Sequence, residues 1–303
     1  CTLVALPAAG YRFEGWYTTD GYTQRLSSST TYLYTPASND ASIFPKFTAS
    51  TRPLDDEGTA NCYIAPELNT SYSFDATTMG NGRATTNIVP KRLAGAEAKV
   101  LWETGTIRGA IVESAELTGD GRIVFRTGMT YGNAVIGLLD SRGVCIWSWH
   151  IWSVDYDIEA TAQTYASGAV FMDRNLGALA TDCTQAAAKG LYYQWGRKDP
   201  FPAAPTLTGT TATVGAPIYD GDDNEIKITN SSQSSTADNN LAFAIANPTV
   251  CLSNYAQFNT SRDWLQADMS NDALWGNPKG AERNETNDFL NKGAKSFYDP
   301  CPV

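Results

Sequence analysis

Two short blocks hold the densest set of side chains that could recognise a ligand. They are MDRNLGA at residues 172–178 and GLYYQWGRKDPF at residues 190–201. Both combine amides with charges of opposite sign, and the second adds aromatic rings. Aromatic stacking together with planar hydrogen-bonding groups is the chemistry that sugar recognition requires. The candidate ligand-binding residues share this chemistry: Tyr192, Tyr193, Trp195, Arg197 and Asp199.

The same polar residues also have an internal interpretation. Asp173, Arg174 and Asn175 could hold a loop through arginine–carboxylate and amide hydrogen bonds, and we predict a structural network for these three. Arg197, the adjacent lysine and Asp199 could fix the backbone around Trp195 in the same way. For the second block, both the internal and the ligand-facing interpretation stay open.

An acidic segment, DGDDNE at residues 220–225, places side-chain oxygens at alternating positions, as calcium loops do. The candidate calcium ligands are Asp220, Asp222 and Asn224. The segment lacks the full EF-hand pattern, so a solvated acidic turn is the alternative. No other cofactor is predicted.

Catalytic groups are sparse. His150 is the only histidine, so a Ser–His–Asp or Cys–His site would need it as the base. It lies in the tryptophan-rich segment 145–152, far in sequence from any candidate nucleophile, which predicts a buried or junction histidine. Acidic residues are abundant, yet no local pattern singles out a glycosidase pair. We therefore predict that the chain is not an enzyme, with a glycan hydrolase as a lesser alternative.

The six cysteines are widely separated and form no CxxC pair, which disfavours zinc and leaves sparse disulfides or buried thiols. Cys62 and Cys145 could meet within one domain, and Cys183, Cys251 or Cys301 within the next. The sequence does not choose among these pairings.

Composition limits the partners. A length of 303 residues allows two or three domains, and a net charge of −10 spread along the chain argues against nucleic-acid binding. No apolar run approaches the roughly 20 residues of a membrane-spanning helix. A membrane is expected to be reached only through a lipid anchor at or before the N-terminus, for which Cys1 is the candidate. We also expect the chain to be a fragment of a longer precursor.

Alternating apolar residues and frequent turn signals predict a mainly β, multi-domain chain. Residues 1–50 form a small unit of strands and residues 51–59 a polar linker. About seven short strands in residues 60–154 predict an antiparallel, immunoglobulin-like sandwich. Its last strand, at 145–152, carries large side chains on both faces and is predicted to lie at a domain junction. Residues 155–303 form the third domain, in which the polar region 202–240 is predicted to be a surface loop.

Two resemblances refine this organisation. With PAAGYRFEGWY at 7–17 and PKF at 45–47, residues 1–50 resemble the Listeria–Bacteroides repeat, or InlB B-repeat. This implies a β-grasp-like stalk or spacer module of surface proteins. The blocks VFMDRNLGA, GLYYQWGRKDPF and YDPCPV resemble the Fibrobacter major paralogous (FISUMP) domain. That resemblance, which extends over residues 60–303 to fimbrillin-like lipoproteins of the Bacteroidetes, implies a partial α+β, C-type-lectin-like third domain that is incomplete at its C-terminal end.

These observations predict a non-enzymatic extracellular protein, secreted or on the outer-membrane surface of a gut-type bacterium. Its expected role is adhesion, with a glycan or a surface protein as partner. The alternative is a structural stalk or fimbria-associated subunit, which an exposed sheet edge suited to strand addition would favour.

Overall fold

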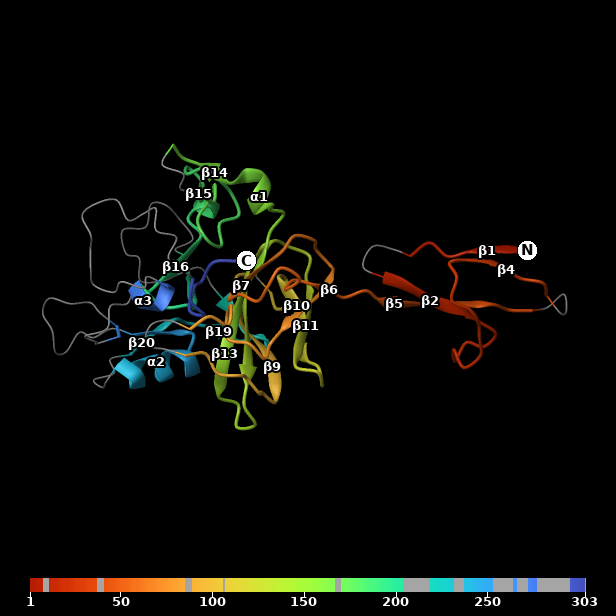
Figure 1. Cartoon of the computed structure of the whole chain (residues 1–303), viewed down its shortest axis with the longest axis horizontal. Coiled ribbons are helices and arrows are strands. Elements are labelled where there is room, and N and C mark those ends of the chain that lie inside the picture. The colour runs from red at the N-terminus through yellow and green to blue at the C-terminus, as the bar shows by residue number, and fades with distance from the viewer. Residues whose placement is uncertain are drawn as a thin grey trace, which may run out of the picture. The chain divides into compact units, whose positions relative to one another are not determined.

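The computed structural model describes residues 1–7, 11–36, 41–84, 89–105, 107–166, 170–203, 218–231, 237–252, 264–265, 272–276 and 295–302. Within these residues the chain is mainly β, as predicted. It divides into two compact units (Figure 1). The first holds residues 1–52 and 69–71, and the second holds residues 53–68 and 72–303.

The first unit contains five short strands: β1 (Thr2–Val4), β2 (Tyr11–Tyr17), β3 (Arg25–Ser27), β4 (Thr31–Leu33) and β5 (Phe44–Ala49). β1 pairs with β4, and β2 lies between β3 and β5 in an antiparallel sheet. The core is an aromatic cluster in which the Phe13 ring lies 5.0 Å from Trp16 and 5.5 Å from Phe47. Gly15 lets β3 approach, because a Cβ atom there would lie 2.9 Å from Ser27 O.

The second unit is built on a six-stranded sheet with the order β19-β18-β9-β12-β13-β7. Its strands are β7 (Cys62–Ala65), β9 (Glu97–Glu103), β12 (Gly132–Leu139), β13 (Cys145–Ser153), β18 (Ile218–Tyr219) and β19 (Glu225–Ile226). β7 pairs parallel to β13, and the other neighbours are antiparallel. Every residue of β12 is buried, and apart from Asn133 all of them are apolar residues or glycine, as expected for a central strand.

A four-stranded sheet with the order β10-β11-β8-β6 faces the larger sheet. Its strands are β6 (Arg52–Pro53), β8 (Ser71–Asp75), β10 (Val112–Leu117) and β11 (Arg122–Thr127). Between the sheets, the Phe74 ring lies 5.2 Å from Trp149 and 4.7 Å from Tyr63. The seven strands β7 to β13 fall within residues 62–153, which is the number that the turn spacing predicts.

The opposite face of the six-stranded sheet is also covered. Val135 points away from the main core and packs with Trp102, Leu191 and Ile218. Trp152 forms another cluster with Val154 and Tyr156. Side chains of β13 thus face the main core on one side and the segment after residue 155 on the other.

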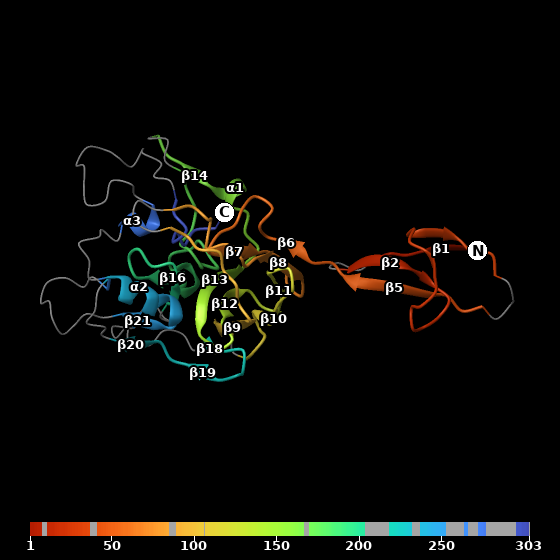
Figure 2. The ribbon, with the colours of Figure 1, turned by 60° about the horizontal axis from the view of Figure 1, so that its bottom comes forward.

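The remaining elements are short: α1 (Ile158–Thr161), β14 (Gln163–Thr164), β15 (Val170–Phe171), a 3₁₀ helix (Ala186–Ala188), β16 (Leu191–Tyr193), β17 (Pro200–Pro202), β20 (Thr229–Ser231), α2 (Ala237–Ala246), β21 (Val250–Leu252) and α3 (Asp272–Trp275). α2 lies against β13 (Figures 1 and 2). The main core also takes in late residues, since Trp147 packs on Phe297 at 6.0 Å and on Tyr298 at 5.5 Å. Among the described residues, no helix is long and apolar enough to cross a membrane.

One predicted surface loop is partly wrong. Within the region 202–240, β18 pairs with β9 through Tyr219 and Glu103, and Ile218 is 1% exposed. This short hairpin extends the central sheet, because Ile218 is buried against Trp102 and Val135 and pairs with Ile226 across the hairpin. Residues 204–217 and 232–236 of the same region lie outside the described residues.

Candidate functional site

The five predicted ligand-binding residues lie on β16 and the turn that follows it, but they do not share one surface. Trp195 is 60% exposed and Tyr192 is 49% exposed, whereas Arg197 is 1% and Asp199 is 3% exposed. Tyr193 is half-buried and packs in the cluster around Trp102. The prediction of ligand contact is therefore wrong for Arg197 and Asp199, because burial leaves none of their polar atoms available to a ligand.

Arg197 is the centre of a buried hydrogen-bonding network. Its Nη1 donates to Gln194 Oε1 at 3.0 Å and to Val250 O at 2.7 Å. Its Nη2 donates to Ala244 O at 3.2 Å and to Asn247 O at 3.0 Å. These last two carbonyls belong to the C-terminal end of α2, where helical carbonyls lack partners within the helix and a cation is favoured. Arg197 thus joins the turn after β16 to α2 and β21.

Asp199 completes the network on the side of β13. Its Oδ2 accepts from Arg197 Nε at 3.3 Å, and its Oδ1 accepts from Ser148 Oγ at 2.6 Å and from Lys198 Nζ at 2.5 Å. Burial alone would raise the pKa of Asp199, yet the two cations hold it below its ordinary value. The Lys198 ammonium also lies 4.5 Å from the centre of the Trp147 ring. Asp199 is therefore an ionised internal anchor.

The exposed Trp195 is connected to this network through Trp264 and Trp275. Its carbonyl accepts from Trp264 Nε1 at 2.8 Å, and its ring lies 4.8 Å from that of Trp275 with an interplanar angle of 54°. Trp275 Nε1 in turn donates to Arg197 O at 3.2 Å. Gly196 has a φ of +85°, a conformation that glycine adopts without strain. Contacts on the protein side of Trp195 thus hold the indole in place while its ring remains exposed to solvent.

In the first sequence block, Arg174 and Asn175 make hydrogen bonds and ring contacts with neighbouring segments. Arg174 Nε donates to Asp173 Oδ1 at 2.8 Å, and its guanidinium lies 4.0 Å from the centre of the Tyr156 ring. Asn175 Nδ2 donates to Ala188 O at 3.4 Å and to Lys189 O at 3.3 Å. These contacts tie the loop after β15 to the end of the 3₁₀ helix.

The predicted calcium ligands form a tight turn between β18 and β19. Asp220 Oδ1 accepts from the backbone N–H groups of Asp222 and Asn224, both at 2.9 Å, and Asp222 pairs with Lys99. The oxygens are directed at protein donors rather than at a common point. No three His, Cys, Asp or Glu side chains within the described part of the chain gather as metal ligands. The Asp220 oxygens thus form the turn and Asp222 pairs with Lys99, and calcium binding by Asp220, Asp222 and Asn224 stays a prediction.

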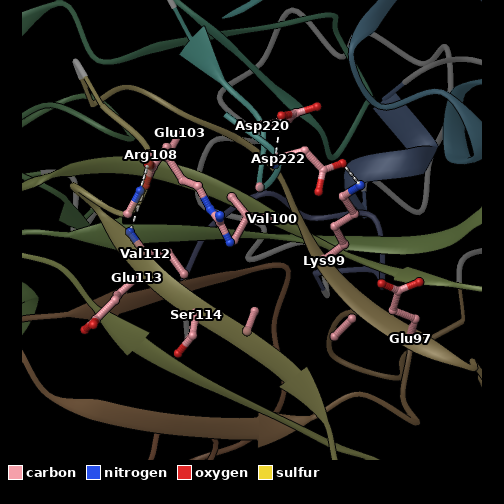
Figure 3. A pocket seen from close by; sticks show the side chains of 14 residues that line it. Glu97, Lys99, Val100, Glu103, Arg108, Val112, Glu113, Ser114, Asp220 and Asp222 are labelled. Carbon is pink, nitrogen blue, oxygen red and sulfur yellow. Dashed lines mark hydrogen bonds and ion pairs between the residues drawn. The ribbon is translucent and has the colours of Figure 1, made fainter. Parts of the chain in front are cut away.

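This turn borders a polar groove of about 200 Å³ between β9 and β10 (Figure 3). Charged side chains from three segments line it, as Figure 3 shows: Glu97, Lys99, Glu103, Arg108, Glu113, Asp220 and Asp222. Glu103 is buried at the inner end of the groove. Its carboxylate accepts from the backbone N–H groups of Gly109, Ile111 and Val112, at 2.5, 3.0 and 2.9 Å. Glu103 thus holds the start of β10 beside β9.

The Glu103→Gln substitution is expected to lower the free energy of unfolding by about 1–3 kcal/mol. A carboxamide keeps the shape of the side chain but replaces one accepting oxygen with an N–H₂ group, which would face backbone donors. Urea unfolding measures the loss. Glu113→Gln is the matched control, since Glu113 pairs with Arg126 at the surface. Equal stabilities of both variants would contradict this role of Glu103.

A buried constellation that the sequence did not predict lies where β7 meets β13. Cys62 Sγ lies 3.1 Å from His150 Nδ1, and His150 Nε2 lies 2.9 Å from Asn133 Oδ1. Because Asn133 Nδ2 donates to Gly177 O at 2.9 Å, its Oδ1 accepts from the histidine. Nδ1 is then the accepting nitrogen, and Cys62 donates its S–H to it. The sequence did not predict this contact, because the parallel pairing of His150 with Cys62 brings together residues that are 88 positions apart.

The order thiol–imidazole–amide is that of a cysteine hydrolase site, but the electrostatics differ. Such a site needs a thiolate that a substrate can reach. Cys62 is 0% exposed, and burial, followed by the nearby Cys301 thiol, raises its pKa well above the ordinary value. Burial lowers the pKa of His150 to about 3. Both groups are therefore neutral near pH 7, and the trio acts as a hydrogen-bonded strut within the core.

The proposed meeting of Cys62 with Cys145 is wrong. The register of β7 and β13 places Cys62 beside His150, five residues from Cys145. Five residues of strand extend about 16 Å, far beyond the reach of a disulfide. Cys145 instead donates its S–H to Trp147 O at 3.2 Å.

Comparison with known proteins identifies the first unit. Residues 1–51 match the family model described as a divergent InlB B-repeat domain. The predicted B-repeat is thus confirmed. No curated protein and no solved structure matches the chain. The resemblance of the residues after the B-repeat to the FISUMP domain stays a prediction.

Proposed function

We propose that this chain belongs to a non-enzymatic extracellular bacterial protein that binds a glycan through Trp195 and Tyr192. The B-repeat is typical of surface proteins and supports an extracellular position, at the cell surface or secreted. The single observation that carries the proposal is the exposed indole of Trp195, which Trp275, Trp264 and the Arg197 network support from below.

The physical argument rests on rigidity and exposure together. An exposed ring that is already fixed loses little side-chain entropy when a sugar stacks its apolar C–H face upon it. The neighbouring strand β16 presents the half-exposed Tyr192, which adds a second ring and a hydroxyl group. Polar groups around the rings would then set the orientation of the bound sugar.

A glycan array probed with the full chain tests the proposal. Binding to at least one glycan is expected, and Trp195→Ala should weaken it at least roughly tenfold, because the stacking surface is removed. Phe171→Ala is the matched control: its ring is 57% exposed in the same unit but lies in the β14–β15 hairpin against Tyr165. An unchanged affinity of the Trp195 variant, or an array without any bound glycan, would overturn the proposal.

A structural role is the second candidate, and one observation favours it. β10 is the end strand of its sheet, and the groove of Figure 3 runs beside it. An end strand next to a groove can accept an added strand from another polypeptide. An empty glycan array combined with concentration-dependent self-association in sedimentation experiments would favour this role over glycan binding.

A further inference from the structure

The last described residues of the chain are built into the edge of the six-stranded sheet beside β7. Pro302 forms a parallel β-bridge with Cys62 (Figure 2 shows the C-terminal end near β7). Asn61 Nδ2 donates to Phe297 O at 2.7 Å and to Asp299 O at 2.9 Å. This segment therefore has a fixed position relative to Cys62, although it lies more than 230 positions away in sequence.

The bridge brings a second cysteine within reach of Cys62. Bridge partners in a sheet lie about 5 Å apart, and one residue of extended chain adds about 3.3 Å along the strand. Cys301 adjoins Pro302 at a bend, so its Cα atom lies within roughly 9 Å of that of Cys62, close to the 4.4–6.8 Å that a disulfide spans. Backbone N–H of Cys301 is held by Asp299 Oδ1 at 2.8 Å, which fixes the turn that presents it.

The electrostatics of the interior agree with this placement. Burial is the largest cause that raises the pKa of Cys62, and the Cys301 thiol is the next largest. Burial raises the pKa of Cys301 itself to about 12. Burial is likewise the largest cause that raises the pKa of Tyr193, and the thiols of Cys62 and Cys301 come next. Both sulfur atoms thus act on the same interior region.

Three other cysteines of the second unit have different surroundings. Cys145 lies five residues along β13 from the position beside Cys62. Cys183 is exposed. Cys251 lies on β21, where Arg197 acts on its thiol. Cys301 is therefore the cysteine that the fold places against Cys62.

We propose that Cys62 and Cys301 form a disulfide bond when the protein folds in an oxidising compartment, and that this bond replaces the S–H donation from Cys62 to His150 Nδ1 that the reduced structure shows. In the balanced reaction, the two thiols lose two protons and two electrons to a small-molecule disulfide such as oxidised glutathione, which is reduced to two thiols. A mixed disulfide forms first, and the second cysteine thiolate displaces the small thiol from it. Because Cys62 is buried in the folded protein, this exchange takes place before the C-terminal segment packs on β7.

Disulfide mapping by mass spectrometry tests the proposal on the full chain. The protein is folded with oxidised glutathione, unfolded without reductant in the presence of N-ethylmaleimide, digested and analysed. The expected result is a linked peptide pair containing Cys62 and Cys301, two hydrogen atoms lighter than the sum of the free peptides, and a maleimide adduct on Cys183. Maleimide on both Cys62 and Cys301, or a link from either to a different cysteine, overturns the proposal.

Thermal unfolding gives an independent measurement. The bond would close a loop of about 240 residues, and we expect reduction to lower the Tm by roughly 5–15 °C. Cys301→Ser should remove this dependence on reductant, whereas Cys183→Ser should retain it. A wild-type Tm that does not change on reduction would contradict the proposed bond.

Discussion

Replacement of Arg197 by leucine is expected to lower the free energy of unfolding by about 3–5 kcal/mol. The guanidinium makes hydrogen bonds to four backbone or amide oxygens and to Asp199, all within the core. Leucine would remove the guanidinium donor from Val250 O and Ala244 O inside the core, and Asp199 would keep only Lys198 as a cation. Gln194 Oε1 and Asn247 O would each retain a backbone N–H donor. Removal of one partner from a buried ion pair costs more than the pair contributes, because an uncompensated charge remains.

Urea unfolding followed by tryptophan fluorescence measures this loss, since all tryptophans except Trp16 lie in the second unit. Arg197→Lys should lose less stability than the leucine variant, because it keeps the charge but not the planar fork of donors. Arg142→Leu is the control: Arg142 forms a surface pair with Asp140 and is expected to be dispensable. A stability of the Arg197→Leu variant within 1 kcal/mol of wild type would show that the network is unimportant.

The second large effect is a loss of stability in acid that originates at His150. Its pKa is about 3 in the folded protein, compared with about 6.5 in an unfolded chain. The unfolded state therefore takes up a proton first, and the contribution of the neutral imidazole is present above pH 6.5 and lost as the pH falls toward 3. At about 1.4 kcal/mol per pH unit, the shift from pH 7 to pH 5 should remove about 2 kcal/mol.

Denaturant unfolding at several pH values checks this slope. His150→Gln stays neutral throughout and should show a shallower dependence than wild type. Because His150 is the only histidine, a direct test is also available in the unmodified protein. Its imidazole resonances in an NMR titration should not move between pH 8 and pH 5. A midpoint near 6.5 would contradict the burial argument.

Local patterns predicted the elements better than the contacts between them. The alternation of apolar residues located every strand from β7 to β13, because half-buried strands need it. The B-repeat was recognisable because its glycines and aromatic residues match those of the repeat family, and residues 1–51 match the family model. By contrast, Ile218 follows a proline in a segment too short to show alternation and gave no strand signal, although it anchors β18.

The site was predictable only in part, for two physical reasons. Charged residues are usually exposed, so the sequence alone left both the Arg197–Asp199 network and a binding surface open. Burial decides between them, and burial depends on α2 and β21, which follow some 40 to 50 residues later. The Cys62–His150–Asn133 trio depends on the register of a parallel strand pair, which no local pattern encodes.

The position of Phe297 and Tyr298 against Trp147 has a consequence for the order of events during protein synthesis. Strand β13 leaves the ribosome roughly 150 residues before its aromatic cover, which corresponds to a delay of roughly 10–30 s at ordinary elongation rates. Throughout that interval the nascent chain presents an incomplete apolar surface. Contacts of such long sequence separation also slow the search for the native topology. Demand for holding chaperones should accordingly be greatest late in translation, and a pause before residue 297 should increase aggregation of the nascent protein.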